Sequence, residues 1–292
     1  MGDRDRSGLA EADRLGERPA DPGGGWLGLR FDRPHPARVY DYLLGGKDNF
    51  AADREAAAAG LKANPDLRIP PRENRAFLRR AVAYLAREAG ISQFLDIDTR
   101  IPTSPNVHEV AQGIYPRAQV VYVDNDPVVL AHARALLTSR RAGRTAFVDA
   151  DVRDPDAILG AAELRRTLNL NQPVALLLLA ILHFVPDDDD PEGIVRKLMA
   201  GLPSGSYLAL SHLTGDFDPA FWDGAAAMYG RDGVVMQVRS KPDIERFFDG
   251  LELVEPGVVS GPDWRPDPSD LGDAGRPTDA QVSGYCGVAR KP

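Results

Sequence analysis

The sequence predicts an α/β fold in which helices cover both faces of a mostly parallel sheet. Two patterns after Gly90 predict this fold class: short apolar runs typical of buried strands, and segments with helical periodicity between them. Because parallel neighbours need a crossover connection, this alternation indicates right-handed βαβ units.

The elements follow from this alternation. Strands are predicted over residues 94–97, 120–124, 145–151, 174–185 and 206–213. Helices are predicted between them, over residues 106–114, 127–140, 155–168 and 191–202. Nearer the carboxyl end we expect strands in 234–240, 251–259 and 283–291 and a helix in 241–250, with the last strand antiparallel to its neighbour.

The residues before Gly90 divide into two parts. Residues 1–33 mix glycine and charged residues without periodicity and predict a mobile tail. Residues 34–90 predict a helical segment: a short helix that ends at Gly45 and Gly46, a second that starts near Ala52, and a third from Pro71 to just before Gly90. Residues 91–292 then form the sheet domain.

Composition excludes several classes of protein. The 292 residues carry 35 Lys and Arg against 43 Asp and Glu, a formal net charge of −8, which disfavours nucleic acid and anionic lipid as partners. The longest apolar run, residues 174–185, is too short to span a membrane, and no secretory signal is recognisable. With a single cysteine, Cys286, the chain is expected in the cytoplasm. Nothing indicates its oligomeric state.

Motifs of other enzyme classes are absent. The sequence has no GxxxxGK[ST], GxSxG or HExxH pattern, which argues against a phosphate loop, a serine hydrolase and a zinc protease. The four acids at 187–190 suggest either a divalent metal site or a solvated cap before the next helix. We prefer the cap, and predict no metal site.

Candidate binding residues follow the predicted strands. In an open α/β sheet, ligands bind beyond the carboxyl ends of the strands. The first strand leads into Asp96, Asp98, Arg100 and Thr103. The second ends at Asp124 and Asn125, where an acid typically accepts hydrogen bonds from ribose hydroxyls. The third leads into Asp151 and Val152, where the carboxylate either receives an adenine amino group or caps the next helix.

These residues, in this order, resemble class I S-adenosylmethionine-dependent methyltransferases. The stretches YDYLLGGKDNF, IPTSPNVHEVAQ and VVYVDNDPVVLAHARALL look more closely like the actinobacterial family of S-adenosyl methyltransferases. The resemblance covers about residues 33–292. It implies a Rossmann-like, seven-stranded sheet, S-adenosylmethionine as the cofactor, and an N-terminal helical lid over it. The lid residues that it implies at the cofactor are Tyr42, Gly45, Gly46, Lys47, Asn49 and, on the next helix, Arg75.

One departure from the family is the loop after the first strand. It reads DIDTRIPTS, with Asp98 and Arg100 where the family has glycines. Glycine serves there because the backbone approaches the cofactor closely and needs positive φ. Charged side chains should crowd the pocket, although Arg100 could instead pair with the cofactor's carboxylate and Asp98 with its ammonium group.

The expected activity is methyl transfer to a small-molecule acceptor. His183 and His212, at the ends of the fourth and fifth predicted strands, are the candidate catalytic bases. The stretch 216–230 carries Phe217, Phe221, Trp222, Met228 and Tyr229, which either line an acceptor pocket or, as we slightly prefer, belong to the core. The alternatives are a degenerate, non-catalytic binding or regulatory module and, more weakly, a dinucleotide-dependent oxidoreductase, which the missing GxGxxG disfavours.

Overall fold

The structure is a computed structural model that describes residues 31–136, 142–231, 233–270 and 275–292. Residues 1–30 of the predicted tail, and residues 137–140 of a predicted helix, lie outside the described residues. Residues 31–33 form a turn that leads into the first helix.

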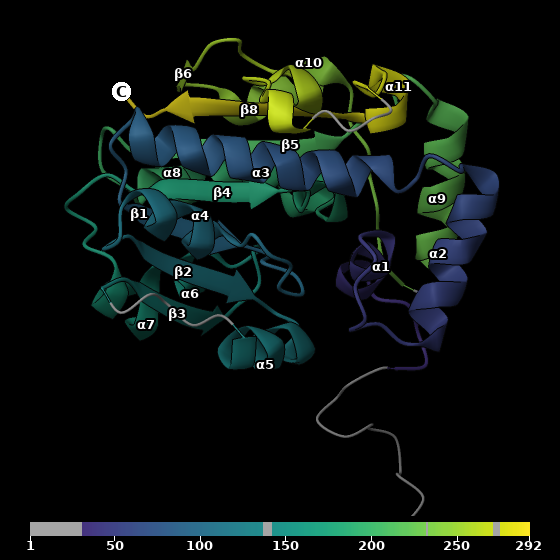
Figure 1. Ribbon diagram of the computed structural model, residues 1–292, viewed down its shortest axis with the longest axis horizontal. Helices are drawn as coiled ribbons and strands as arrows, with labels where there is room; N and C mark the ends of the chain where they lie inside the picture. The colour runs from purple at the N-terminus through teal and green to yellow at the C-terminus, as the bar shows by residue number, and fades with distance from the viewer. Residues whose placement is uncertain (1–30, 137–141, 232, 271–274) are drawn as a thin grey trace, which may run out of the picture. The chain divides into compact units, whose positions relative to one another are not determined.

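The described residues form one sheet of eight strands in the order β3-β2-β1-β4-β5-β8-β6, with β7 paired to β8 (Figure 1). The strands β1 to β5 are parallel and β8 is antiparallel to β5, which confirms the predicted mixed sheet. The expected count of seven is one short, because β7 adds a two-residue strand beside that path. The strands are β1 Gln93–Ile97, β2 Gln119–Asp124, β3 Arg144–Asp149, β4 Ala175–Leu179, β5 Tyr207–Leu213, β6 Glu252–Leu253, β7 Val259–Ser260 and β8 Gly284–Arg290.

Helices lie on both faces of the sheet, as predicted. Alternate residues of each strand point to opposite faces, so Phe94 packs in one buried cluster and Leu95 in the other. The first cluster contains residues of α3, α4 and α5, and the second contains residues of α6, α7 and α8. The helices are α1 Pro36–Leu43, α2 Ala51–Ala63, α3 Ile69–Arg87, α4 Val107–Ile114, α5 Pro127–Leu136, α6 Pro155–Gly160, α7 Ala162–Thr167, α8 Pro191–Ala200, α9 Pro219–Arg231, α10 Lys241–Glu245 and α11 Asp279–Val282.

Four predicted elements differ from the structure. The expected strand 251–259 is replaced by two strands of two residues each, β6 and β7. The apolar run 174–185 is not one strand: Ala180 has a φ of 58°, which ends β4, and a 3₁₀ helix, Leu182–Phe184, follows. Helix 155–168 breaks into α6 and α7 because Ala161 is extended. Residues 234–240 form no strand, since Gln237 and Arg239 make only isolated hydrogen bonds to the carbonyls of His183 and Leu213.

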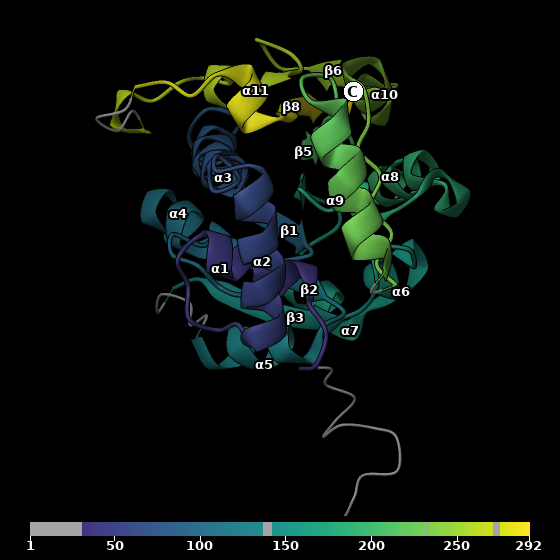
Figure 2. The same ribbon diagram turned by 90° about the vertical axis from the view of Figure 1, so that its right-hand side faces the viewer.

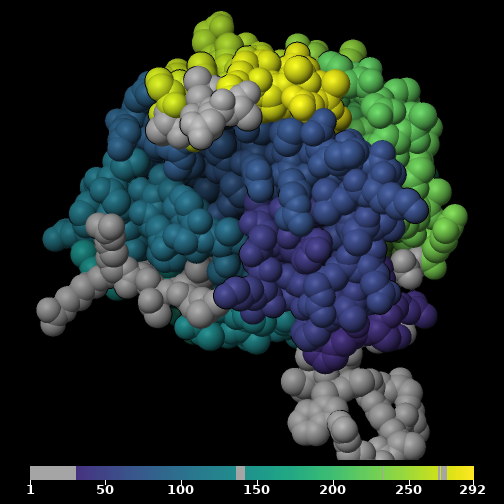
Figure 3. All heavy atoms as spheres, turned by 45° about the vertical axis from the view of Figure 1, so that its right-hand side comes forward, coloured from purple at the N-terminus to yellow at the C-terminus, as the bar shows by residue number. Residues whose placement is uncertain are grey.

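The N-terminal helices α1 and α2 lie beside α9 at the carboxyl end of the parallel strands, whereas α3 runs across one face of the sheet (Figures 1 and 2). In Figure 3 these purple and blue helices form the surface next to the green residues of α9. A buried ion pair joins α1 to α2, with Arg38 Nε donating to Asp53 Oδ2 at 2.9 Å. Asp53 also accepts hydrogen bonds from the backbone N–H groups of His35 and Phe50, at 2.9 and 2.8 Å.

Asp53→Asn should lower the free energy of unfolding by about 3 kcal/mol, because the neutral amide removes the negative charge from the buried ion pair with Arg38. Chemical denaturation measures this loss. Glu55→Gln, on the exposed face of the same helix, is the matched control and should change stability by less than about 0.5 kcal/mol. Equal stability of the two variants would contradict the role assigned to Asp53.

Candidate functional site

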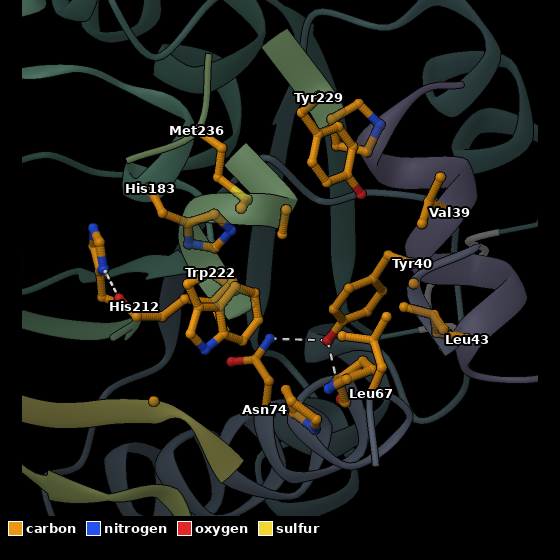
Figure 4. A pocket seen from close by; sticks show the side chains of 18 of the residues that line it. Val39, Tyr40, Leu43, Leu67, Asn74, His183, His212, Trp222, Tyr229 and Met236 are labelled. Carbon is orange, nitrogen blue, oxygen red and sulfur yellow. Dashed lines mark hydrogen bonds between the residues drawn. The ribbon is translucent and has the colours of Figure 1, made fainter. Parts of the chain in front are cut away.

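Two adjoining cavities lie at the carboxyl edge of the sheet. The first, which we call the acidic compartment, has a volume of about 290 Å³ and lies beyond β1, β2 and β3. The second, the apolar cavity, has a volume of about 400 Å³ and lies between α1, α2, α3 and α9 and the ends of β4 and β5 (Figure 4). Pro36 and Phe184 line both cavities, so the two share a border.

The acidic compartment collects several residues predicted from the strand ends. They are Asp98, Asp124, Asn125, Asp151 and Val152. Asp124 is 4% exposed, and its carboxylate accepts the backbone N–H groups of Arg100 and Asp126 at 3.0 and 2.9 Å. Burial, followed by the nearby charge of Asp98, raises the pKa of Asp124 well above its ordinary value. Asp151 is more exposed and accepts a hydrogen bond from the Asn125 side chain at 2.7 Å.

The turn after β1 keeps the backbone of a glycine turn without its glycines. Asp98 has a φ of 62° and Arg100 a φ of 61°, both in the left-handed region that favours glycine. A non-glycine residue in that region costs about 1 to 2 kcal/mol. Strain of this kind persists where surrounding contacts hold the backbone, and here the Arg100 N–H is held by Asp124.

The side chain of Arg100 reaches from β1 to the end of β4. Its guanidinium donates to the carbonyl of Ala180 and, at 3.3 Å, to Asp98 Oδ2. It also lies over the ring of Tyr40, with its central carbon 4.3 Å from the ring centroid. Arg100 is 7% exposed and lines the apolar cavity, whereas Asp98 lines the acidic compartment. The two side chains expected to crowd the cofactor thus face different cavities, and the crowding itself stays a prediction.

Three other predicted residues lie beside the cavities without lining them. Asp96, at the end of β1, is buried, and burial raises its pKa to about 7 against opposing contributions from Arg75 and Arg100. The Arg75 guanidinium donates to the carbonyls of Thr103 and Pro105. It therefore ties α3 to the turn after β1 and positions that turn.

The glycine-containing turn after α1 does not line either cavity. Asn49 Nδ2 donates to Asp41 Oδ2 at 2.8 Å, and Gly46 leaves no room for a Cβ because the Asp41 carboxylate occupies that space. The turn thus folds around Asp41. The residues predicted here to bind a cofactor are Tyr42, Gly45, Gly46, Lys47 and Asn49; they line neither cavity, and their role stays a prediction. The part of this segment that lines the cavities is α1 itself, through Pro36, Val39, Tyr40 and Leu43.

The two candidate histidines both line the apolar cavity but differ in their contacts. His212 Nδ1 lies 2.6 Å from the Leu213 carbonyl and Nε2 lies 3.0 Å from Arg239 Nη1, so neither nitrogen is free to receive a proton. Burial lowers the pKa of His212 to about 3. His183 Nδ1 is buried and has no hydrogen-bond partner within the described part of the chain, and burial lowers the pKa of His183 well below its ordinary value. His183 is thus a neutral imidazole, and we retain it alone as a candidate base.

Most of the wall of the apolar cavity could not be found from local sequence patterns. Phe221, Trp222, Met228 and Tyr229 of α9 do line it, while Phe217 does not and is 37% exposed. Tyr40, Asn74 and Ser211 come from three elements, and they meet in a chain of hydrogen bonds. Asn74 Nδ2 donates to the Tyr40 hydroxyl at 3.0 Å, and Ser211 Oγ donates to Asn74 Oδ1 at 2.6 Å. No signal in the sequence joins these three positions.

The acids at 187–190 make protein contacts. Asp187 accepts from Arg239, Asp189 accepts from Arg153, and Asp190 caps α8 through the Gly193 N–H at 2.9 Å. No group of three potential metal ligands is found in the part of the chain that the structure describes. The same residues include no helix long and apolar enough to cross a membrane.

Comparisons with known proteins agree on one family. The family model described as S-adenosyl methyltransferase matches residues 28–292. A DUF574 family protein from Streptomyces avermitilis is 51% identical, with a TM-score of 0.86 over 90% of this chain and 100% of that one. A candidate methyltransferase from Thermobifida fusca is 42% identical, with a TM-score of 0.80 over 91% of this chain and 98% of that one. The comparison with curated proteins gives no match.

The raised pKa of Asp96 predicts a pH-dependent stability. Between an unfolded pKa near 3.8 and a folded pKa of about 7, the unfolded chain loses the Asp96 proton first, so stability falls as the pH rises. From pH 5 to pH 8 this group should cost about 3 kcal/mol. Denaturation of the wild type and Asp96→Asn at both pH values measures it: the variant should lack this loss, and parallel profiles would contradict the shift.

Arg100→Gly should tighten the binding of S-adenosylhomocysteine by about tenfold, because a ligand that spans both cavities no longer has to break the hydrogen bond of the guanidinium to Ala180. Calorimetric titration measures the affinity. Arg72→Ala, at an exposed position of α3, should leave it unchanged. Weaker binding by Arg100→Gly would instead show that the guanidinium holds the ligand.

Proposed function

Because the chain belongs to the S-adenosyl methyltransferase family, we propose that it transfers the methyl group of S-adenosylmethionine to a small-molecule acceptor. The observation that carries this proposal is the shared border of the two cavities, since methyl transfer needs the donor and the acceptor side by side. In this arrangement the acidic compartment holds the nucleoside of the cofactor and the apolar cavity holds the acceptor.

The residues of the acidic compartment fit a nucleoside. Each carboxylate oxygen of Asp124 accepts one backbone N–H and keeps a further lone pair for a ribose hydroxyl. Ile97, Val152 and Ile181 supply an apolar surface for the base. Asp151 stands at the same compartment and can accept the adenine amino group.

When bound, S-adenosylmethionine supplies an activated methyl group on a positively charged sulfur. The residues around the border of the two cavities have three tasks. The apolar cavity excludes water from this region through α1, α2 and α9. The Tyr40–Asn74–Ser211 chain fixes the position of α1 against α3 and β5. His183, held neutral by burial, accepts a hydrogen bond from a protonated acceptor atom.

We also propose a cytoplasmic enzyme whose acceptor is not a nucleic acid. The net charge of −8 repels phosphate backbones, and the lining of the apolar cavity includes many more apolar than charged side chains. A polynucleotide would need a basic surface, whereas a small apolar molecule needs the burial that this cavity offers.

Asp124→Asn should weaken the binding of S-adenosylhomocysteine by about tenfold or more, since the amide replaces one of the two accepting oxygens with an NH2 group that cannot accept a ribose hydroxyl. Calorimetric titration of the two proteins measures this. Asp149→Asn is the control, because Asp149 is exposed at the end of β3, in register with Asp124, and does not line the acidic compartment. The affinity of this variant should equal that of the wild type. Equal affinity of Asp124→Asn and the wild type would refute the assigned ribose site.

A further inference from the structure

The walls of the apolar cavity favour a flat, apolar ligand. Aromatic side chains approach it from several elements: Tyr40 from α1, Phe77 from α3, Trp222 and Tyr229 from α9, and Phe184 after β4. Aliphatic side chains of α1 and α2 complete it. A cavity of about 400 Å³ lies in the size range of small-molecule sites. Aromatic walls give a planar ring both burial and favourable ring contacts.

Many of the polar groups in this cavity are already satisfied by the protein. The Tyr40 hydroxyl donates to the Pro71 carbonyl at 3.1 Å and accepts from Asn74. Ser211 donates to Asn74, and both ring nitrogens of His212 have partners. These groups hold the wall together and leave little hydrogen-bonding capacity for a ligand.

Two buried polar atoms of the same cavity have no hydrogen-bond partner among the residues that the structure describes. Trp222 Nε1 and His183 Nδ1 are both buried and make no hydrogen bond, and their residues are 4% and 2% exposed. No hydrogen bond of the Tyr229 hydroxyl is found within the described residues either. Native proteins leave few buried polar groups unsatisfied, so these groups mark where the polar atoms of a ligand would bind.

One cation lies at the polar end of the cavity. The Arg100 guanidinium has a single carboxylate partner among the described residues, Asp98 at 3.3 Å. The charge of Arg100 also affects the Tyr229 hydroxyl. Burial raises the pKa of Tyr229 to about 12, while the charge of Arg100 lowers this pKa. A guanidinium favours an acidic or ionised oxygen and disfavours an ammonium group.

We propose that the acceptor is an apolar aromatic molecule that carries a hydroxyl group on its ring, with that oxygen at Arg100 and Tyr229. This inference rests on the proposed function for the transfer step, but the binding itself does not require it. The acceptor oxygen gives its proton to His183 and forms the new bond to the methyl carbon. The electron pair of the broken carbon–sulfur bond goes to the sulfur, which becomes the neutral thioether of S-adenosylhomocysteine.

The test uses the full chain without cofactor and four probes of one shape: 2-naphthol, naphthalene, 2-naphthylamine and 2-naphthoate. Quenching of tryptophan fluorescence, supported by calorimetry, gives each affinity. We expect 2-naphthol to bind about tenfold more tightly than naphthalene, since it adds a charge-assisted hydrogen bond. We also expect the absorbance of bound 2-naphthol to show ionisation at a lower pH than that of the free compound.

Two variants test the residues that carry the preference. Arg100→Met keeps a long side chain at the same backbone position and should abolish the preference for 2-naphthol while naphthalene binds as before. Tyr229→Phe should reduce the preference by about threefold. Arg72→Met, at an exposed position that lines neither cavity, is the control and should bind like the wild type.

The proposal is overturned if naphthalene or 2-naphthylamine binds as tightly as 2-naphthol, if 2-naphthoate binds most tightly, or if none of the probes binds. A parallel titration with S-adenosylhomocysteine distinguishes failure of the aromatic acceptor from failure of the proposed methyl transfer. Binding of S-adenosylhomocysteine without 2-naphthol refutes the aromatic acceptor alone. Binding of 2-naphthol without S-adenosylhomocysteine supports the aromatic site and refutes the proposed methyl transfer.

Discussion

The geometry of both cavities depends on the left-handed backbone of the turn after β1. At Asp98 and Arg100 the chain adopts φ values near +60° that glycine would adopt without strain. The hydrogen bond from the Arg100 N–H to Asp124 ties this turn to the end of β2, and the guanidinium ties it to the end of β4 at Ala180. The turn thereby joins the carboxyl ends of the three parallel strands β1, β2 and β4. The same contacts place an acid in the compartment beyond β1 to β3 and a cation at the border of the apolar cavity.

The helices that precede the sheet complete this site. Without α1 and α2, the apolar cavity would lose the part of its wall that Val39, Leu43 and Ala57 form. The buried pair of Arg38 and Asp53 holds the two helices together, and Tyr40 bonds α1 to α3 through Pro71 and Asn74. A cover fixed by hydrogen bonds and a buried ion pair excludes water from one side of the border. Another part of the wall comes from α9, which lies far along the chain from α1 and α2.

Sequence patterns could predict those parts of the site that follow directly from strand ends. The apolar run before Asp124 predicts a strand that ends there, and the position of the carboxylate follows from the parallel sheet. The predicted end of the fourth strand was wrong, because the strand stops at the conformation of Ala180 and not at a change in hydropathy. The turn at Gly45 and Gly46 resembles a binding loop because glycines and polar residues serve equally well to fold a chain around Asp41. The meeting of Tyr40, Asn74 and Ser211 depends on tertiary packing, which no local pattern encodes.

We propose that this turn, despite its charged side chains, still belongs to a working site for S-adenosylmethionine. Calorimetric titration of the unmodified full chain with S-adenosylmethionine and S-adenosylhomocysteine, with NAD as the control, tests it most directly. The structure predicts binding of both sulfur compounds at micromolar concentration and no binding of NAD. Failure to bind either sulfur compound would contradict the account and would favour a protein that keeps the methyltransferase fold as a non-catalytic module.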